Sequence, residues 1–451
     1  MTGLALRSLR HRATAFTATF LAVLLGTALI GSFATLIQTA TGPVSSTDGE
    51  TLMVLGAVVG GWGTLIVLFS VASTLAITVR QREVEIGLLR TIGATPRQAR
   101  RLIRLEALVV AILAALGGSL VAAVGGRALL AMLRNGGLVA DDVAYGGGVA
   151  ALAAAAAGVV LTSVLAASIA GRRATGGPAT VALAQGASES GRMRWWRVLA
   201  ALVLIGYGLA MGVVTITVSA DSADPYDAMA TSGSSSILVG VGLALLAPLL
   251  LRWLSVLARP ILGRSGPTGH LAAYNTSRRS HLLSGVLAPV IVLTASSIGT
   301  LTLVGIDGRT LAGGVSTPET HTINVLNNVV VGMLSLFAAI MVINSFAAVV
   351  SHRRAELNRL WLLGATPGQV RGSVLAEAWV VAGVGVLVGA AAALATIVPF
   401  GVARHEGVVP DGQLWLPPLL AAGVVLLTLL SARSAVRRVA PAAPAGQPAL
   451  R

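Results

Sequence analysis

The sequence predicts an all-α integral membrane protein with ten transmembrane helices, and three observations support this fold class. Hydrophobic residues make up 55% of the 451 residues and charged residues only 11%, whereas a soluble protein of this size carries about 25% charged residues. Ten long apolar runs are bounded by charge, and one segment of the chain occurs twice. The polar surface is therefore too small to cover water-facing domains, and the mean hydropathy of +0.84 agrees with this reading.

A bilayer core about 30 Å thick is crossed by roughly 20 apolar residues in a helix. We expect ten spans of this kind, at residues 13–37, 52–79, 105–130, 145–170, 197–219, 235–258, 282–306, 322–350, 374–400 and 414–435. Arg7, Arg10 and Arg12 flank the first run and no convincing cleavage site follows it. We therefore interpret the first run as an uncleaved anchor and not as a signal peptide.

The arginines predict the orientation of the chain in the membrane. All 32 basic residues are Arg. The N-terminus and the loops on its side hold 28 of them, which leaves Arg127, Arg134, Arg309 and Arg404 for the other face. Of the 17 acidic residues, 6 lie on the Arg-rich side and 11 on the other. By the positive-inside rule, we expect a multi-pass plasma-membrane protein with both termini in the cytoplasm, whose juxtamembrane arginines contact membrane lipid.

The composition also excludes several classes of function. The chain has no Lys, so it has no P-loop and cannot hydrolyse ATP by that route. It has no Cys, so it has no disulfide, thiolate metal site or Cys nucleophile. The six His are scattered without ligand spacing, and no basic patch is interleaved with aromatic residues. We expect no catalytic residue, no metal or cofactor bound by this chain, and no nucleic-acid partner.

An internal repeat is the most informative feature of the sequence. Residues 82–107 (REVEIGLLRTIGATPRQARRLIRLEA) align without a gap with residues 353–378 (RRAELNRLWLLGATPGQVRGSVLAEA), at an offset of 271 residues. Eleven of the 26 positions are identical. Two Ala- and Leu-rich helices that resemble each other by chance would match at apolar positions, whereas here many of the shared residues are charged or turn-forming.

The repeated segment predicts a helical elbow. A helix that continues from the second span carries Glu85 and ends at Gly93, the residue type best suited to a left-handed helix end. Thr95 and Pro96 then form a favoured start for a new helix, as an N-cap and a first helical residue. Any reversal between two membrane helices needs similar residues, but the same cap, breaker and charges in two loops favour a shared role in docking a partner.

At this point the sequence resembles a known family. Both segments are similar to the cytoplasmic signature of FtsX-like permeases, the membrane subunits of MacB-type ABC transporters, with the pattern R..EIG.LRA.GA....Q......E.. The first copy matches from Arg82 to Glu106. The second copy departs from the pattern, because Asn358 replaces the Gly and residues 359–361 interrupt the usual run. Its docking is therefore expected to be weaker or asymmetric.

The resemblance implies an architecture and a partner. The two repeats are parallel, in a 4+2+4 arrangement: residues 1–175 (spans 1–4), residues 176–270 (a cytoplasmic linker and spans 5–6), residues 271–440 (spans 7–10) and a disordered tail at 441–451. The partner is an ABC ATPase dimer, which holds the ATP and Mg²⁺. The residues that the resemblance assigns to ATPase coupling are Arg82, Glu85, Gly93, Ala94, Thr95, Pro96, Arg97, Gln98, Arg353, Glu356, Gly364, Ala365, Thr366, Pro367 and Gln369.

Other polar residues have two interpretations each. Glu106 and Glu377 stand at matched span entrances, where they either pair with nearby Arg or transmit strain from the elbow to the span. Gln38 and the span-8 residues Asn327, Asn328 and Asn344 either bond a neighbouring helix or contact substrate. The acceptor-like triplet that begins at Asn275 lies in an inner loop, so we interpret its match to a glycosylation site as chance.

We compare three function classes. The favoured one is a transporter permease in which a separate ATPase drives export or membrane extraction of an amphiphilic substrate such as an antibiotic, a peptide or a lipid. An ion-coupled secondary transporter needs titratable groups at mid-membrane, and the sequence places none well inside a span. A non-transporting mechanotransmission or signalling protein of the FtsX type acts on something outside the cell, but only about fifteen residues, 307–322, are available between spans 7 and 8.

Overall fold

The computed structural model describes residues 13–80, 82–176, 193–222, 227–264, 266–278, 280–310 and 353–439, with residues 332, 335, 339–343, 345–347 and 349–350. All regular structure in this part of the chain is helical. Eight of its helical segments are long and apolar enough to cross a membrane. They are residues 19–40, 96–135, 149–174, 195–221, 227–245, 282–310, 367–403 and 416–437. This confirms the all-α fold class.

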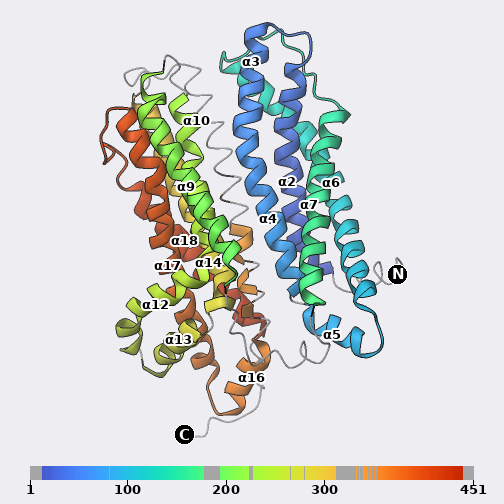
Figure 1. The fold of residues 1–451 in the computed structure, drawn as a ribbon, viewed down its shortest axis with the longest axis vertical. Coiled ribbons are helices and arrows are strands. Elements are labelled where there is room, and N and C mark those ends of the chain that lie inside the picture. Colours follow the sequence, from blue (N-terminus) through green and yellow to red (C-terminus); the bar gives the residue numbers. More distant parts are fainter. Residues whose placement is uncertain are drawn as a thin grey trace.

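The helices pack as two bundles that lie side by side (Figure 1). The first consists of α2 (Ala13–Ala40), α3 (Ser46–Val54), the π-helical turn η1 (Leu55–Val59), α4 (Gly60–Arg80), α5 (Glu83–Thr91), α6 (Pro96–Asn135) and α7 (Val149–Ala174). Its core lies between α2, α4, α6 and α7 and includes Phe33, Leu75 and Leu133. Small residues let the helices approach closely: a Cβ at Gly118 of α6 would clash with α2.

The second bundle consists of α9 (Trp195–Thr217), the 3₁₀ turn η2 (Ser219–Asp221), α10 (Asp227–Gly233), α11 (Ser235–Leu245), α12 (Ala247–Gly263), α13 (Gly266–Arg278), α14 (Ser280–Thr310), α16 (Arg354–Leu362), α17 (Pro367–Ala403) and α18 (Leu416–Val439). Its main core is formed around α14 and α17. The corresponding helices of the two bundles also pack in the same way, with α2 against α6 and α14 against α17.

The helices of the predicted spans 5 and 6 belong to the second bundle. Helix α11 packs against α14 and α17, and polar groups connect α10 and α11 to α17. The Ser232 hydroxyl donates to the Thr396 carbonyl at 3.0 Å, and the Thr396 hydroxyl donates to the Ser232 carbonyl at 2.8 Å. Buried hydroxyls that exchange hydrogen bonds in this way satisfy each other where no water is available.

The predicted bounds of the sixth span, 235–258, are wrong. The apolar helical segment there is 227–245, and a separate helix, α12, begins at Ala247. Helix α12 is covered along one side only, because Leu251 and Ser255 are buried while Trp253 and Val256 are exposed. Two consecutive helices with different environments therefore look like a single apolar run in the sequence.

The structure leaves several predictions untested. The predicted second span falls on η1 and α4, and the predicted eighth span lies largely outside the described residues; neither is among the eight candidate spans. Asn327, Asn328 and Asn344, most of the linker that precedes α9, and the tail also lie outside the described residues. The loop predicted at 307–322 begins later than expected, because Asp307 lies in the last turn of α14.

Candidate functional site

The first elbow, residues 83–98, joins α5 to α6 by two consecutive helix-end motifs. The amide of Ala94 donates to the Leu89 carbonyl at 2.9 Å and that of Gly93 to the Arg90 carbonyl at 3.2 Å, which is the Schellman pattern. Gly93 has a φ of 106°, a left-handed conformation that favours glycine. The predicted helix end at Gly93 is therefore confirmed.

Helix α6 then begins with a capping box. The Thr95 hydroxyl accepts from the Gln98 amide at 3.3 Å, and the Gln98 side chain accepts from the Thr95 amide at 2.8 Å. Pro96 is the first helical residue, as predicted. The two capping hydrogen bonds and the φ fixed by proline stabilise the elbow through local contacts.

The second elbow, residues 354–369, repeats this construction between α16 and α17. Gly364 has a φ of 96°. The amide of Ala365 donates to the Leu360 carbonyl at 3.0 Å. Thr366 and Gln369 form the same capping box, at 3.2 and 2.9 Å. The turn thus survives the departures from the signature that occur in α16.

Both elbows lie at the same end of the molecule, as α5 and α16 in Figure 1. Their tips are exposed, with Ile92 at 82% and the matching Leu363 at 84% of full exposure. The two tips differ in chemistry. The first turns of α6 carry Arg97, Arg100, Arg101 and Arg104, whereas the matching positions of α17 are Gly368, Arg371, Gly372 and Leu375.

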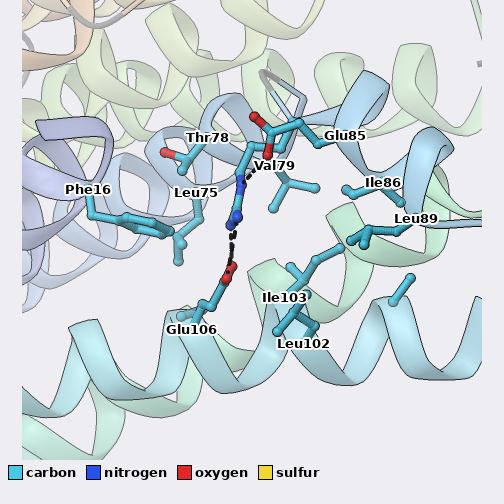
Figure 2. A pocket seen from close by; sticks show the side chains of 13 residues that line it. Phe16, Leu75, Thr78, Val79, Glu85, Ile86, Leu89, Leu102, Ile103 and Glu106 are labelled. Carbon is cyan, nitrogen blue, oxygen red and sulfur yellow. Dashed lines mark hydrogen bonds and ion pairs between the residues drawn. The ribbon is translucent and has the colours of Figure 1, made fainter. Parts of the chain in front are cut away.

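A buried ion pair connects each elbow to its long helix. The Arg82 guanidinium binds both carboxylate oxygens of Glu106, through Nη1 to Oε2 and through Nη2 to Oε1 at 3.3 Å. Its Nε also donates to Glu85 at 3.5 Å. Glu106 is only 1% exposed, and Figure 2 shows it pointing from α6 towards the side of Phe16 and Thr78. We call this contact the first root pair.

The second root pair is the same contact 271 residues later. Arg353 binds Glu377 through Nη1 to Oε2 and through Nη2 to Oε1 at 3.2 Å, and its Nε donates to Glu356 at 3.3 Å. Burial by itself lowers the pKa of Arg353, but the charges and hydrogen bonds of Glu377 and Glu356 outweigh it and raise the pKa above its ordinary value. Arg353 is therefore held as a cation in a buried site.

The root pairs join residues that the sequence analysis treated separately. Arg82, Glu85, Arg353 and Glu356 were assigned to the elbow, and Glu106 was assigned to strain transmission or to pairing with an Arg. The structure shows that both glutamates pair with an Arg. The expected continuous helix is also corrected, because Arg82, which precedes α5, has a non-helical ψ of 7°. This break redirects the Arg82 side chain to α6.

Two groups of polar residues were missed by sequence reasoning. Asn275 of α13 donates its amide to Glu377 at 2.8 Å, so the residue set aside as a chance match is a third partner of the second root pair. At the other end of α17, Arg404 binds Asp307 at 2.7 Å and Arg309 binds both carboxylate oxygens of Glu406. Helix α14 ends with one acidic and one basic residue, and another such pair of residues directly follows α17. This pattern could have suggested that the two helix ends form ion pairs with each other.

Other candidate residues are structural in the described part of the chain. The Gln38 side-chain oxygen accepts from the amides of Gly148 and Ala151, at 3.0 and 3.1 Å, and so bonds a neighbouring helix at the start of α7. Among the described residues, His, Asp and Glu form no group of three that could hold a metal ion.

Comparison with known proteins agrees with the repeat. A family model described as FtsX-like permease C-terminal matches residues 57–179 and 328–441, which together are just over half of the chain. The two matched segments begin 271 residues apart, the offset that separates the two elbows. A search of curated proteins finds no match.

Proposed function

The chain belongs to the FtsX-like permease family, and from this premise we propose that it is the membrane subunit of an ABC transporter, driven by a separate ATPase dimer through its two elbows. As a permease with many apolar helices, it is a multi-pass membrane protein. The observation that carries the proposal is the duplicated elbow: two rigid, exposed turns of one construction at one end of the molecule, each fixed to a long helix by a buried ion pair. Two such elbows suit a partner with two equivalent grooves.

Each elbow continues into a long helix. Helix α6 has 40 residues and α17 has 37, so at about 1.5 Å per residue each extends for about 55–60 Å. This is more than the bilayer core of about 30 Å, so each helix crosses the membrane and projects beyond it. A displacement of Thr95 would tilt the whole of α6, and a displacement of Thr366 would tilt the whole of α17. In each case the root pair prevents the short helix, α5 or α16, from turning independently of the long helix.

In the second bundle, two ion pairs at the end of α17 that is opposite the elbow would make α14 move together with α17. Arg404 follows α17 and binds Asp307 of α14, and Glu406 binds Arg309 of α14. Because α14 and α17 also pack along their lengths, they would move as one body. ATP-driven approach of the two ATPase subunits would thus bring the elbows together and change the space between the bundles.

The topology follows from the same arrangement. With ten spans in the 4+2+4 order, the end that carries the elbows faces the cytoplasm, where the ATPase and its ATP and Mg²⁺ are found, and both termini lie on that side. The arginines around the first elbow agree with this orientation. The short outer segments at 41–45, 136–148 and 404–415 offer little surface for a large soluble substrate. We therefore expect an amphiphilic substrate that is exported or extracted from the membrane.

The test is ATPase coupling in a purified complex. The tagged chain would be purified from its native membranes with its ABC ATPase, reconstituted into nanodiscs and assayed for ATP hydrolysis. Replacing residues 93–96 with Gly-Ser-Gly-Ser should abolish stimulation of the ATPase by the permease while the chain remains monodisperse. Gly158→Ala, in α7 and open on all sides, is the matched control and should change nothing. Full coupling in the elbow variant would refute the proposal.

A further inference from the structure

Helices α12 and α13 project from the side of the second bundle, at the end that carries the elbows (Figure 1). Leu246, between α11 and α12, has a non-helical ψ of 3°. Pro248 lies in the first turn of α12 and has no backbone N–H, so it cannot donate to the Ala244 carbonyl and continue α11. Helix α12 packs beside α13, α14 and α17 instead.

The break between α11 and α12 lies at the boundary of the membrane. The Arg197 guanidinium donates from Nε to the carbonyl of Leu245, the last residue of α11, at 2.8 Å. Arg197 is in the first turn of α9, directly after the exposed Trp195 and Trp196. Tryptophan is enriched where a span meets the headgroup region. Helix α12 therefore begins at the depth of the lipid headgroups.

One side of α12 is apolar and uncovered at this depth. Leu249, Trp253 and Val256 follow one another at intervals of four and three residues, so they lie on one side of the helix. All three are exposed, with Trp253 at 75% of full exposure. Leu271 and Tyr274 of α13 are exposed as well. A Trp-bearing apolar side on a helix at the membrane boundary is typical of a helix that lies in the interface.

The charges around these helices are all positive. Residues 228–306 contain five Arg and no acidic residue. Arg252, Arg264 and Arg278 are exposed, and within the part of the chain that the structure describes none of the three forms an ion pair. Arg278 lies over the Tyr274 ring, 5.6 Å from its centre. Uncompensated arginines at a membrane surface favour lipids with a net negative charge.

We propose that α12 and α13 form a platform that lies in the membrane interface and binds anionic lipid. Trp253 and its apolar neighbours enter the boundary of the acyl chains, and the three exposed arginines bind headgroup phosphates. Asn275 of α13 donates to Glu377, so lipid bound to the platform holds α13 against the second root pair. The inference rests on the proposed function only for the side of the membrane on which the platform lies.

The absence of Cys from the chain allows a test with a single introduced thiol. Val256→Cys places a bimane label on the apolar side of α12, and Leu209→Cys, exposed in the middle of α9, places one within a span. The labelled chain is reconstituted into vesicles in which either phosphatidylglycerol or phosphatidylcholine carries brominated acyl chains, which quench bimane on contact. The ratio of the two quenching efficiencies gives the preference of each position for the anionic lipid.

Two triple variants separate the platform from the general charge of the surface. The first replaces the platform arginines, as Arg252→Gln, Arg264→Gln and Arg278→Gln. The matched control removes the same charge from exposed arginines of α7 and α18, as Arg172→Gln, Arg173→Gln and Arg437→Gln. Each set is combined with the label on α12.

With the native arginines, both lipids should quench the label on α12, and phosphatidylglycerol should do so at least about threefold more strongly. The label on α9 should show no preference. The platform variant should lose the preference and remain quenched by phosphatidylcholine, whereas the control should keep it. Absence of quenching on α12, or equal preference in the two triple variants, would overturn the proposal. No ATPase is present, so either result leaves the docking role of the elbows unaffected.

Discussion

Neutralising Glu377 should destabilise the second bundle more than any other single change at the elbows. Glu377 is 1% exposed, and its carboxylate accepts from Arg353 twice and from Asn275 once. Glu377→Gln leaves Arg353, itself 5% exposed, buried as a cation with Glu356 as its remaining acidic partner among the described residues. Removing one partner of a buried ion pair costs about 3–5 kcal/mol, so the free energy of unfolding should fall by that amount.

The expected loss for Glu377→Gln can be compared with the losses expected for variants of neighbouring and matching residues. Glu356 has a side chain that is 31% exposed, so Glu356→Gln should cost at most about 1 kcal/mol. Glu106→Gln should fall at the lower end of the buried range, about 3 kcal/mol, because the Arg82 side chain is 18% exposed. Replacing both partners of the second pair, as Arg353→Met with Glu377→Leu, removes the unpaired charge and should recover most of the stability.

The assay is equilibrium unfolding in mixed lipid and SDS micelles, followed by tryptophan fluorescence, with Trp379 two residues after Glu377 as a local reporter. A loss for Glu377→Gln no larger than that for Glu356→Gln would refute the buried pair. A double variant as unstable as Glu377→Gln alone would show that packing, and not charge compensation, determines the loss.

Three further predictions concern the elbows. Thr95→Ala removes half of a capping box and should cost about 1 kcal/mol, measured by the same unfolding assay, whereas Thr95→Ser should retain most of the stability. Gly93→Ala places a Cβ at a φ of 106° and should cost about 1–2 kcal/mol; Gly368→Ala, in the helical first turn of α17, is the control and should be neutral or stabilising. Replacing Arg97 and Arg101 by Gly, the residue at the matching positions of the second elbow, should reduce the salt dependence of ATPase binding in a titration with NaCl; an unchanged slope would contradict a role for these charges in docking.

The elbows could be predicted from sequence because their conformations depend on local residues. Gly93, Thr95 and Pro96 determine a helix end, a cap and a first turn through short-range hydrogen bonds and backbone sterics. The second copy of the motif showed that the pattern is not chance. The same reasoning holds for the all-α fold class, which follows from long apolar runs.

The root pairs and the bounds of span 6 could not be derived from local residues, because they depend on tertiary contacts. Arg82 and Glu106 are 24 residues apart, and nothing in either helix alone indicates that a break at Arg82 turns one towards the other. Helix α12 continues the apolar composition of α11, so only its packing separates them. Asn275 was missed because its partner comes from a helix 102 residues later.

The central claim is that the two elbows are the sites at which an ABC ATPase binds this permease. The most direct measurement is the amount of ATPase that stays bound to the purified chain when residues 93–96, residues 364–367 or both are replaced by Gly-Ser-Gly-Ser. We predict reduced binding for each single replacement and no binding for the double one, with the permease still monodisperse. An unchanged amount of bound ATPase in the double replacement would contradict the account.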